Sequence, residues 1–132
     1  LGAVAEQSPV LEAAARRLRD QLLGEVEIAS DAVGVRAADR RELPATDEWR
    51  EYVALRALHD RASRLGGLEL RRLAFPKIHT DVCKLAVWLW NVRREKALAN
   101  AVFRFLLAEA EAVDDARAVE LQRENVKCGS GV

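Results

Sequence analysis

The sequence predicts an all-α fold: a single helical bundle of about four helices, with a long helix at the C-terminal end. Over most of the 132 residues, apolar side chains recur at alternating intervals of three and four, as one face of a helix requires. No glycine or proline occurs from Lys77 to Cys128, so no helix-breaking residue interrupts that stretch. Half of the residues are hydrophobic and 32% are charged, which is typical of a folded domain. We therefore expect one domain, 1–132, with loose ends at 1–7 and 127–132.

The first helix is expected to begin at Ser8, a good N-cap, with Pro9 in the first helical position. It should end between Ser30 and Gly34, and the densely charged segment 34–45 is expected to be a connecting loop. The buried stripe of this first helix is predicted to consist of Leu11, Ala15, Leu18, Leu22, Val26, Ala29 and Val33.

A second helix is expected to start after Thr46 or Asp47, either of which can cap it, and to stop at Gly66 and Gly67. The segment 68–76 should add one or two turns that end at Pro76. The buried stripe of the second helix is predicted to consist of Trp49, Tyr52, Leu55, Leu58, Ala62 and Leu65.

The stretch after Pro76 is too long to be one straight helix of a compact domain. Fifty helical residues would measure about 75 Å, whereas a domain of this size has a radius of gyration of about 14 Å. We expect the helix to break near 91–96 or at 114–115, or else to extend along another chain. Its predicted buried line includes Ile78, Val82, Leu85, Leu89, Val92, Ala99, Phe103, Leu106, Ala110 and Val113.

Composition excludes several classes of function. Basic and acidic residues balance at 21 each, and few aromatic residues interleave with the basic ones, so no nucleic-acid partner is expected. No apolar run approaches the roughly 20 residues that span a bilayer, so we expect a soluble protein.

The chain contains no methionine, which suggests the processed, mature chain of an imported or secreted precursor, but the sequence does not identify the compartment. The two cysteines are expected to be free thiols.

The strongest functional signal is an excess of apolar helix surface around 82–108. We interpret the protein as a non-catalytic helical subunit or assembly module that binds a protein partner or itself through this surface. Tryptophan and arginine are enriched at the centres of protein interfaces. Trp88 lies on the buried line and is expected at the core, whereas Trp90 is expected at a rim or partner contact. The candidate contact residues are Trp90, Val87, Arg94, Phe105 and Trp88.

The alternative is a small all-α enzyme or anion-binding protein with an arginine-lined pocket, similar in type to the helical chorismate mutases. Guanidinium groups bind carboxylates and phosphates in a bidentate manner, so a small anionic ligand would suit such a pocket. Arginine clusters occur at four places, each flanked by acids, and no motif locates a catalytic residue or calls for a cofactor. A non-catalytic role is therefore preferred. The clusters are Arg16, Arg17 and Arg19; Arg36, Arg40 and Arg41; Arg71 and Arg72; Arg93 and Arg94.

Two weaker signals concern histidines. His79 and Cys83 are four residues apart and share a helix face, but a structural zinc site needs four ligands and the sequence supplies no second pair, so no metal is predicted.

The segment 58–74, LHDRASRLGGLELRRLA, resembles the histidine-containing phosphotransfer domains of two-component signalling. Ala62 and Ser63 stand where that family has lysine and glycine, so this function is not adopted. It would require His59 to be exposed in the middle of a helix.

Overall fold

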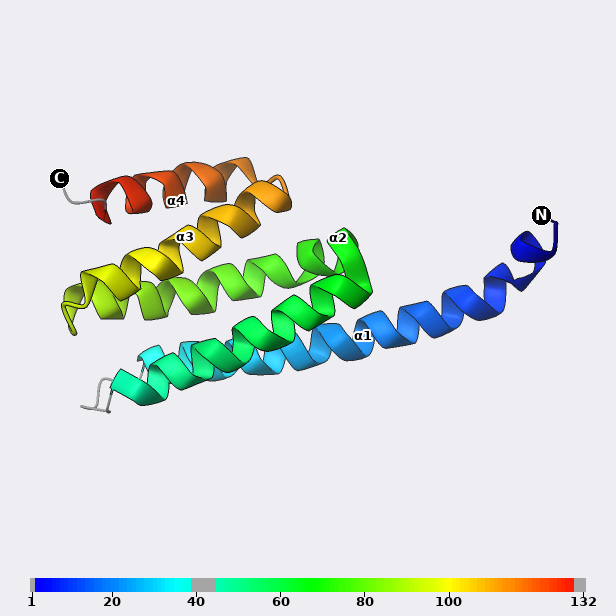
Figure 1. Cartoon of the computed structure of the whole chain (residues 1–132), viewed down its shortest axis with the longest axis horizontal. Helices are drawn as coiled ribbons and strands as arrows, with labels where there is room; N and C mark the ends of the chain where they lie inside the picture. The colour runs from blue at the N-terminus through cyan, green and yellow to red at the C-terminus, as the bar shows by residue number, and fades with distance from the viewer. Residues whose placement is uncertain (1, 39–44, 130–132) are drawn as a thin grey trace.

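The computed structural model describes residues 2–38 and 45–129, and the side chains of 9–37 and 49–128. Four helices account for this part of the chain: α1 (Gly2–Ala38), α2 (Ala45–Asn91), α3 (Lys96–Ala112) and α4 (Ala116–Gly129). Each helix packs on the next one in the chain and runs back along it (Figure 1). The protein is an all-α bundle, as the sequence predicts.

α2 is a hairpin of two helical halves. Gly67 interrupts it with φ 68° and ψ −160°, a backbone conformation that is essentially restricted to glycine. The second half therefore returns beside the first, as Figure 1 shows. The predicted stop at Gly66 and Gly67 is confirmed, but the predicted end at Pro76 is wrong because α2 continues through it to Asn91. Proline removes one hydrogen bond to the carbonyl four residues earlier; Arg72, which carries that carbonyl, is an exposed residue.

Both predicted breaks in the C-terminal stretch are present. After the end of α2 at Asn91, Arg94 takes φ 56°. The Glu95 amide then donates to the Leu89 carbonyl at 2.9 Å. α3 ends in the same way, with Asp114 at φ 59° and the Asp115 amide on the Ala110 carbonyl at 3.0 Å. Such left-handed residues close a helix by satisfying its last carbonyls. Asp115 is the N-cap of α4, because its carboxylate accepts a hydrogen bond from the Ala118 amide at 3.1 Å.

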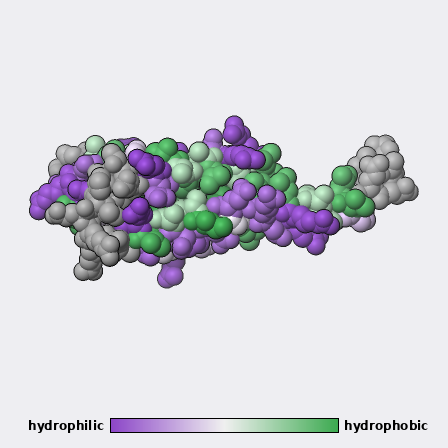
Figure 2. All heavy atoms as spheres, turned by 90° about the horizontal axis from the view of Figure 1, so that it is seen from below, coloured by the Kyte–Doolittle hydropathy of each residue, from purple (hydrophilic) through white to green (hydrophobic). Residues whose placement is uncertain are grey.

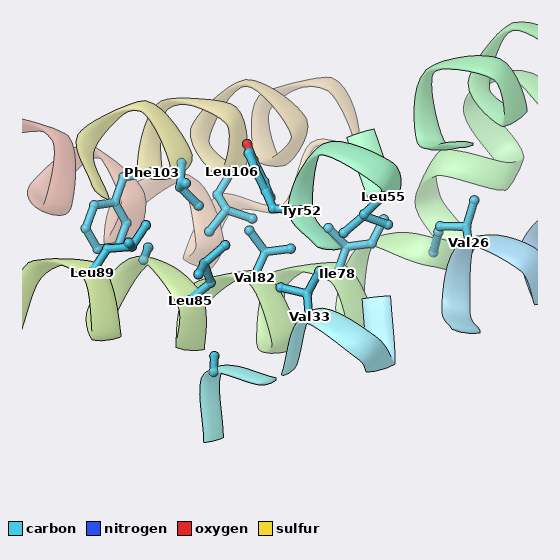
Figure 3. Close-up of a cluster of buried hydrophobic side chains, with 14 of the residues drawn as sticks. Val26, Val33, Tyr52, Leu55, Ile78, Val82, Leu85, Leu89, Phe103 and Leu106 are labelled. Carbon is cyan, nitrogen blue, oxygen red and sulfur yellow. The ribbon is translucent and has the colours of Figure 1, made fainter. Parts of the chain in front are cut away.

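The main core lies between α1, both halves of α2, and α3. Figure 3 shows side chains from all three helices converging: Val26 and Val33 from α1, Leu55, Ile78, Val82 and Leu85 from α2, and Leu106 from α3. Trp88 belongs to this core, as expected, with 9% of its surface exposed. α4 covers a smaller cluster made by Phe75, Ala110 and Ala118.

The ends of α1 differ from the prediction. The helix begins at Gly2 rather than Ser8, so Pro9 lies inside it and the segment 2–7 is helical. It continues past Gly34 to Ala38, which removes the first part of the expected loop; residues 39–44 lie outside the described residues. At the other terminus α4 extends to Gly129, three residues into the segment expected to be loose.

Two glycines in α1 should respond oppositely to alanine. A Cβ at Gly24 would meet no atom within 4 Å, so Gly24→Ala should raise the free energy of unfolding by about 0.5–1 kcal/mol through helix propensity. A Cβ at Gly34 would lie 2.5 Å from Asp81 Oδ1. Asp81 cannot easily move, because it is buried and accepts a hydrogen bond from Ser30 at 2.9 Å. Gly34→Ala should therefore destabilise the protein by about 1–2 kcal/mol.

Urea unfolding of the two variants beside the wild type measures both changes. Equal effects of the same sign would contradict the close approach of α1 to α2 at Gly34.

Candidate functional site

The N-terminal part of α1 projects beyond the rest of the bundle. At about 1.5 Å per residue α1 is about 55 Å long, whereas the first half of α2, residues 45–66, measures about 33 Å. An ion pair at 3.1 Å between Arg19 and Glu69, just after the α2 turn, lies at the base of the projection. We call residues 2–18 the α1 arm. It extends alone in Figure 1, and its coloured part belongs to the narrow extension in Figure 2.

The arm has an apolar face that no part of the described chain covers. Every side chain from Pro9 to Leu18 is exposed, including Val10 at 75%, Leu11 at 57% and Leu18 at 44%. Leu11, Ala15 and Leu18 continue the helical line that α1 buries from Leu22 onward. The predicted stripe is therefore correct for Leu22, Val26 and Val33. It is wrong for Leu11, Ala15 and Leu18, because α2 turns back before it reaches them.

The residues predicted for partner contact lie at the other end of the bundle. Val87, 44% exposed, borders two neighbouring grooves. One, of about 690 Å³, lies between the end of α1 and α2 and includes Trp88. The other, of about 220 Å³, lies between α2, α3 and α4 and includes Trp90. Trp90 is half-buried, with the Lys96 ammonium 5.2 Å from its ring centre, so it lies at a rim.

The two remaining candidates are separated from these grooves. Arg94 is exposed in the turn between α2 and α3. Phe105 faces the first half of α2, where its ring meets Tyr52 and His59 edge-on, and the Arg56 guanidinium lies 4.1 Å above it. The structure thus brings Val87, Trp88 and Trp90 together. Phe105 has intramolecular partners on most of its surface. The prediction that Val92 is buried is wrong, because this residue is 65% exposed in the turn.

A buried ionic cluster joins three helical segments. Glu109 of α3 accepts two hydrogen bonds from Arg71, from Nη2 and, at 3.3 Å, from Nε. Its other contact is His59, whose Nε2 lies 3.0 Å from Oε2. Burial by itself would raise the pKa of Glu109, but His59 and Arg71 outweigh it and lower that pKa from 4.5 to about 2. Glu109 is therefore an anion at neutral pH.

The anion-binding alternative would have its pocket beside this cluster. A pocket of about 390 Å³ beside it is bordered by Arg56, Arg64 and Arg71. Glu109 already neutralises Arg71 from within the chain, and Asp60 also borders the pocket. His59 is 5% exposed, so it does not have the open position that a phosphate-carrying histidine requires.

His79 and Cys83 serve to hold α4. The buried amide nitrogen of Gln122 lies 2.9 Å from His79 Nε2 and 3.9 Å from the Cys83 sulfur. Burial lowers the pKa of His79 and raises the pKa of Cys83, so both are neutral groups at neutral pH. Within the described ranges, no three histidine, cysteine, aspartate or glutamate side chains gather as metal ligands would.

Comparison with known proteins gives no guide to function. No protein-family model, curated protein or solved structure matches the chain. In the part of the chain that the structure describes, no helix is long and apolar enough to cross a membrane.

Sequence reasoning missed two features of this geometry. The arm's exposure depends on where α2 turns, and periodicity reports only which face of a helix is apolar. Glu109 carried a local signal, because it follows Leu106 by three residues on the buried face of α3. Its partners, His59 and Arg71, are 50 and 38 residues away, and nothing in the sequence connects them to it.

Proposed function

We propose that this protein is a non-catalytic helical interaction module, and that the α1 arm is its main contact surface. The observation that carries this proposal is the exposed continuation of α1's buried apolar face through Leu18, Ala15 and Leu11. A helix with an apolar stripe gains stability by burying it against another element. The bundle leaves that stripe without a cover, so a helix from a partner would complete the packing.

Burial of the exposed apolar side chains would contribute free energy to association. Fully burying a leucine or valine side chain contributes about 1.5–3 kcal/mol. Val10, Leu11 and Leu18 are each about half exposed or more, and they lie along two turns of one helix.

The grooves beside Val87 and Trp90 form a second candidate surface, at the opposite end of the bundle. They hold three of the five predicted contact residues, Val87, Trp88 and Trp90, but most of the apolar surface of 82–108 is covered by the protein's own helices. The arm has no such cover. We therefore assign the main contact to the arm and keep the grooves as the secondary surface.

The anion-binding alternative is located at the pocket bordered by Arg56, Arg64 and Arg71. Glu109 and Asp60 supply two carboxylates there, so the pocket holds its own counter-ions. Nothing in its geometry favours a free anion over these groups, and the interaction module is the better-supported function.

Site-specific photo-cross-linking tests the proposed function. A photoreactive residue at Leu18, within the full chain in its native cells, should form covalent adducts with a protein partner. The control is the same residue at Asp20, which is exposed on the opposite side of the helix and should give none. Adducts of either kind, with another protein or with a second copy, support the module. A chain that forms no adduct from Leu18, or equal adducts from Asp20, would overturn it.

A further inference from the structure

We propose that α4 exchanges between two copies of this chain, so that α4 of each copy packs on α2 and α3 of the other. The hinge of this exchange is the turn of residues 113–115 between α3 and α4. The surfaces involved are separate from the α1 arm, so the exchange is independent of the proposed function.

The turn between α3 and α4 is closed by an L-residue in a costly backbone conformation. Asp114 has φ 59°, in the left-handed region, which aspartate tolerates better than most residues but glycine adopts freely. No glycine or proline occurs from Lys96 to Cys128, so no residue of this stretch requires a turn. Opening the turn returns Asp114 to a negative φ. Short, strained turns favour the exchange of the element that follows them.

α4 is held by few buried contacts. Among its described side chains, Ala118 and Gln122 are buried, whereas Leu121 is 48% exposed. The backbone of α4 approaches that of α3, and α4 reaches α2 through side chains. Figure 1 shows it beside α3, on the side of the bundle away from α1. It meets the main core at Val126, so its release disturbs that core little.

The turn before α3 has the same backbone feature, with Arg94 at φ 56°. α3, however, contributes Val102, Phe103 and Leu106 to the main core. Its release would open that core to water, at a large cost in buried apolar surface. Exchange is therefore expected at residues 113–115 and not at the turn between α2 and α3.

A second copy of the chain replaces every contact that α4 loses on release. Release alone would uncover Phe75 and Ala110 and would separate the Gln122 amide from His79. The α4 of another copy presents the same Ala118 and Gln122 to the same positions. When both copies exchange, the result is a closed dimer in which two turns are open and all of these contacts are kept.

The short connection to α3 sets the concentration at which the dimer forms. A partner tied by a short linker has an effective concentration in the millimolar range. The α4 of a second copy therefore competes when the protein concentration reaches about 0.1–1 mM, and relief of the two turns lowers this threshold. The dimer should separate slowly, because both α4 helices must leave before it does.

Light scattering of the full chain, at concentrations up to about 1 mM, tests the exchange. Asp114→Gly accommodates the positive φ of the closed turn, so it should raise the dissociation constant of the dimer at least about tenfold. Asp114→Ala should lower it, because alanine adopts the left-handed conformation less readily than aspartate. Arg94→Gly is the matched control. It relieves the same conformation in a turn that does not open, so it should leave the dissociation constant unchanged.

Disulfide trapping identifies the exchanged helix. Ala110→Cys and Ala118→Cys are made as separate variants, each with Cys83→Ala and Cys128→Ser. Both positions belong to one buried cluster, and each is four residues from Asp114.

A mixture of the two variants, incubated at about 1 mM and then oxidised, should give a linked dimer. Neither variant should do so alone, because equivalent positions then lie on opposite sides of the hinge, about 12 Å apart along the helices. A chain with both cysteines should link within itself in dilute solution.

The exchange would be overturned by wild type and Asp114→Ala proteins that stay monomeric at about 1 mM with a native helical spectrum. Equal dissociation constants for Asp114→Ala and Asp114→Gly would overturn it too, because the dimer would then form without opening the turn. The same holds for a mixture that does not link although the double-cysteine chain does. Leu18→Glu should leave the dimer unchanged, and its loss in that variant would assign the dimer to the α1 arm instead.

Discussion

Replacing Glu109 by alanine is expected to lower the free energy of unfolding by about 2–4 kcal/mol at neutral pH. The change removes the shared partner of His59 and Arg71 and leaves a small cavity between α2 and α3. The loss stays below the largest values for buried ion pairs, because Arg71 has 30% of its side chain exposed and can turn to water. Urea unfolding monitored by circular dichroism measures the difference.

The matched control is Glu111→Ala. Glu111 is two residues further along α3 and is exposed, with the Arg123 guanidinium 3.8 Å away. Exposed pairs contribute about 0–1 kcal/mol, so this variant should be close to the wild type. Equal losses from the two variants would show that the buried cluster contributes nothing beyond a surface pair.

The contribution of Glu109 should also disappear in acid. Its pKa is about 2 in the folded protein against an ordinary value of 4.5, so the folded state favours the ionised carboxylate. The resulting stability is fully present above about pH 4.5 and is lost as the pH falls towards 2. The difference between the wild type and Glu109→Ala should shrink over this range. A difference that stays constant from pH 4.5 to about 2 would contradict the ionic role of Glu109.

Replacing Gly67 by alanine should destabilise the protein by about 1–3 kcal/mol through the backbone alone. A Cβ at Gly67 would meet no atom within 4 Å, so the cost arises from φ 68° and ψ −160°, where L-residues are strained. The mirror image of this conformation lies in the polyproline II region, which suits an ordinary residue. A D-alanine at position 67, introduced by ligation of synthetic and expressed segments, should therefore recover most of the loss.

Denaturant unfolding of the two semisynthetic proteins makes the comparison. If L-alanine and D-alanine destabilise the protein equally, the turn does not depend on the positive φ. The consequence for function is direct, because the position of this turn determines how much of α1 is left as the arm.

Local patterns predicted most of the bundle. Gly66 and Gly67 marked the α2 turn, and the acidic pair at 114–115 marked the start of α4. The three-and-four spacing correctly placed Leu55, Ile78 and Leu106 in the core. These features depend on residues a few positions apart, so the sequence displays them.

The incorrect predictions concern how far each helix extends and which helices pack on one another. The same spacing that identified Val26 as buried also included Leu11 and Leu18, because it cannot show how far the covering helix extends. Pro76 predicts a stop, whereas the loss of one hydrogen bond is tolerated within the packed second half of α2. The arm and the Glu109 cluster both depend on tertiary contacts, and neither has a local motif.

Amide hydrogen exchange along α1 in the full-length chain tests most directly the central claim that the α1 arm lies uncovered. A helical arm of this length has little stability in water without a partner. In dilute purified protein, residues 9–18 should therefore exchange rapidly, whereas the segment from Leu22 to Val33, which packs on α2, should be protected. Equal protection of the two segments would contradict the assignment of the α1 arm as an exposed contact surface.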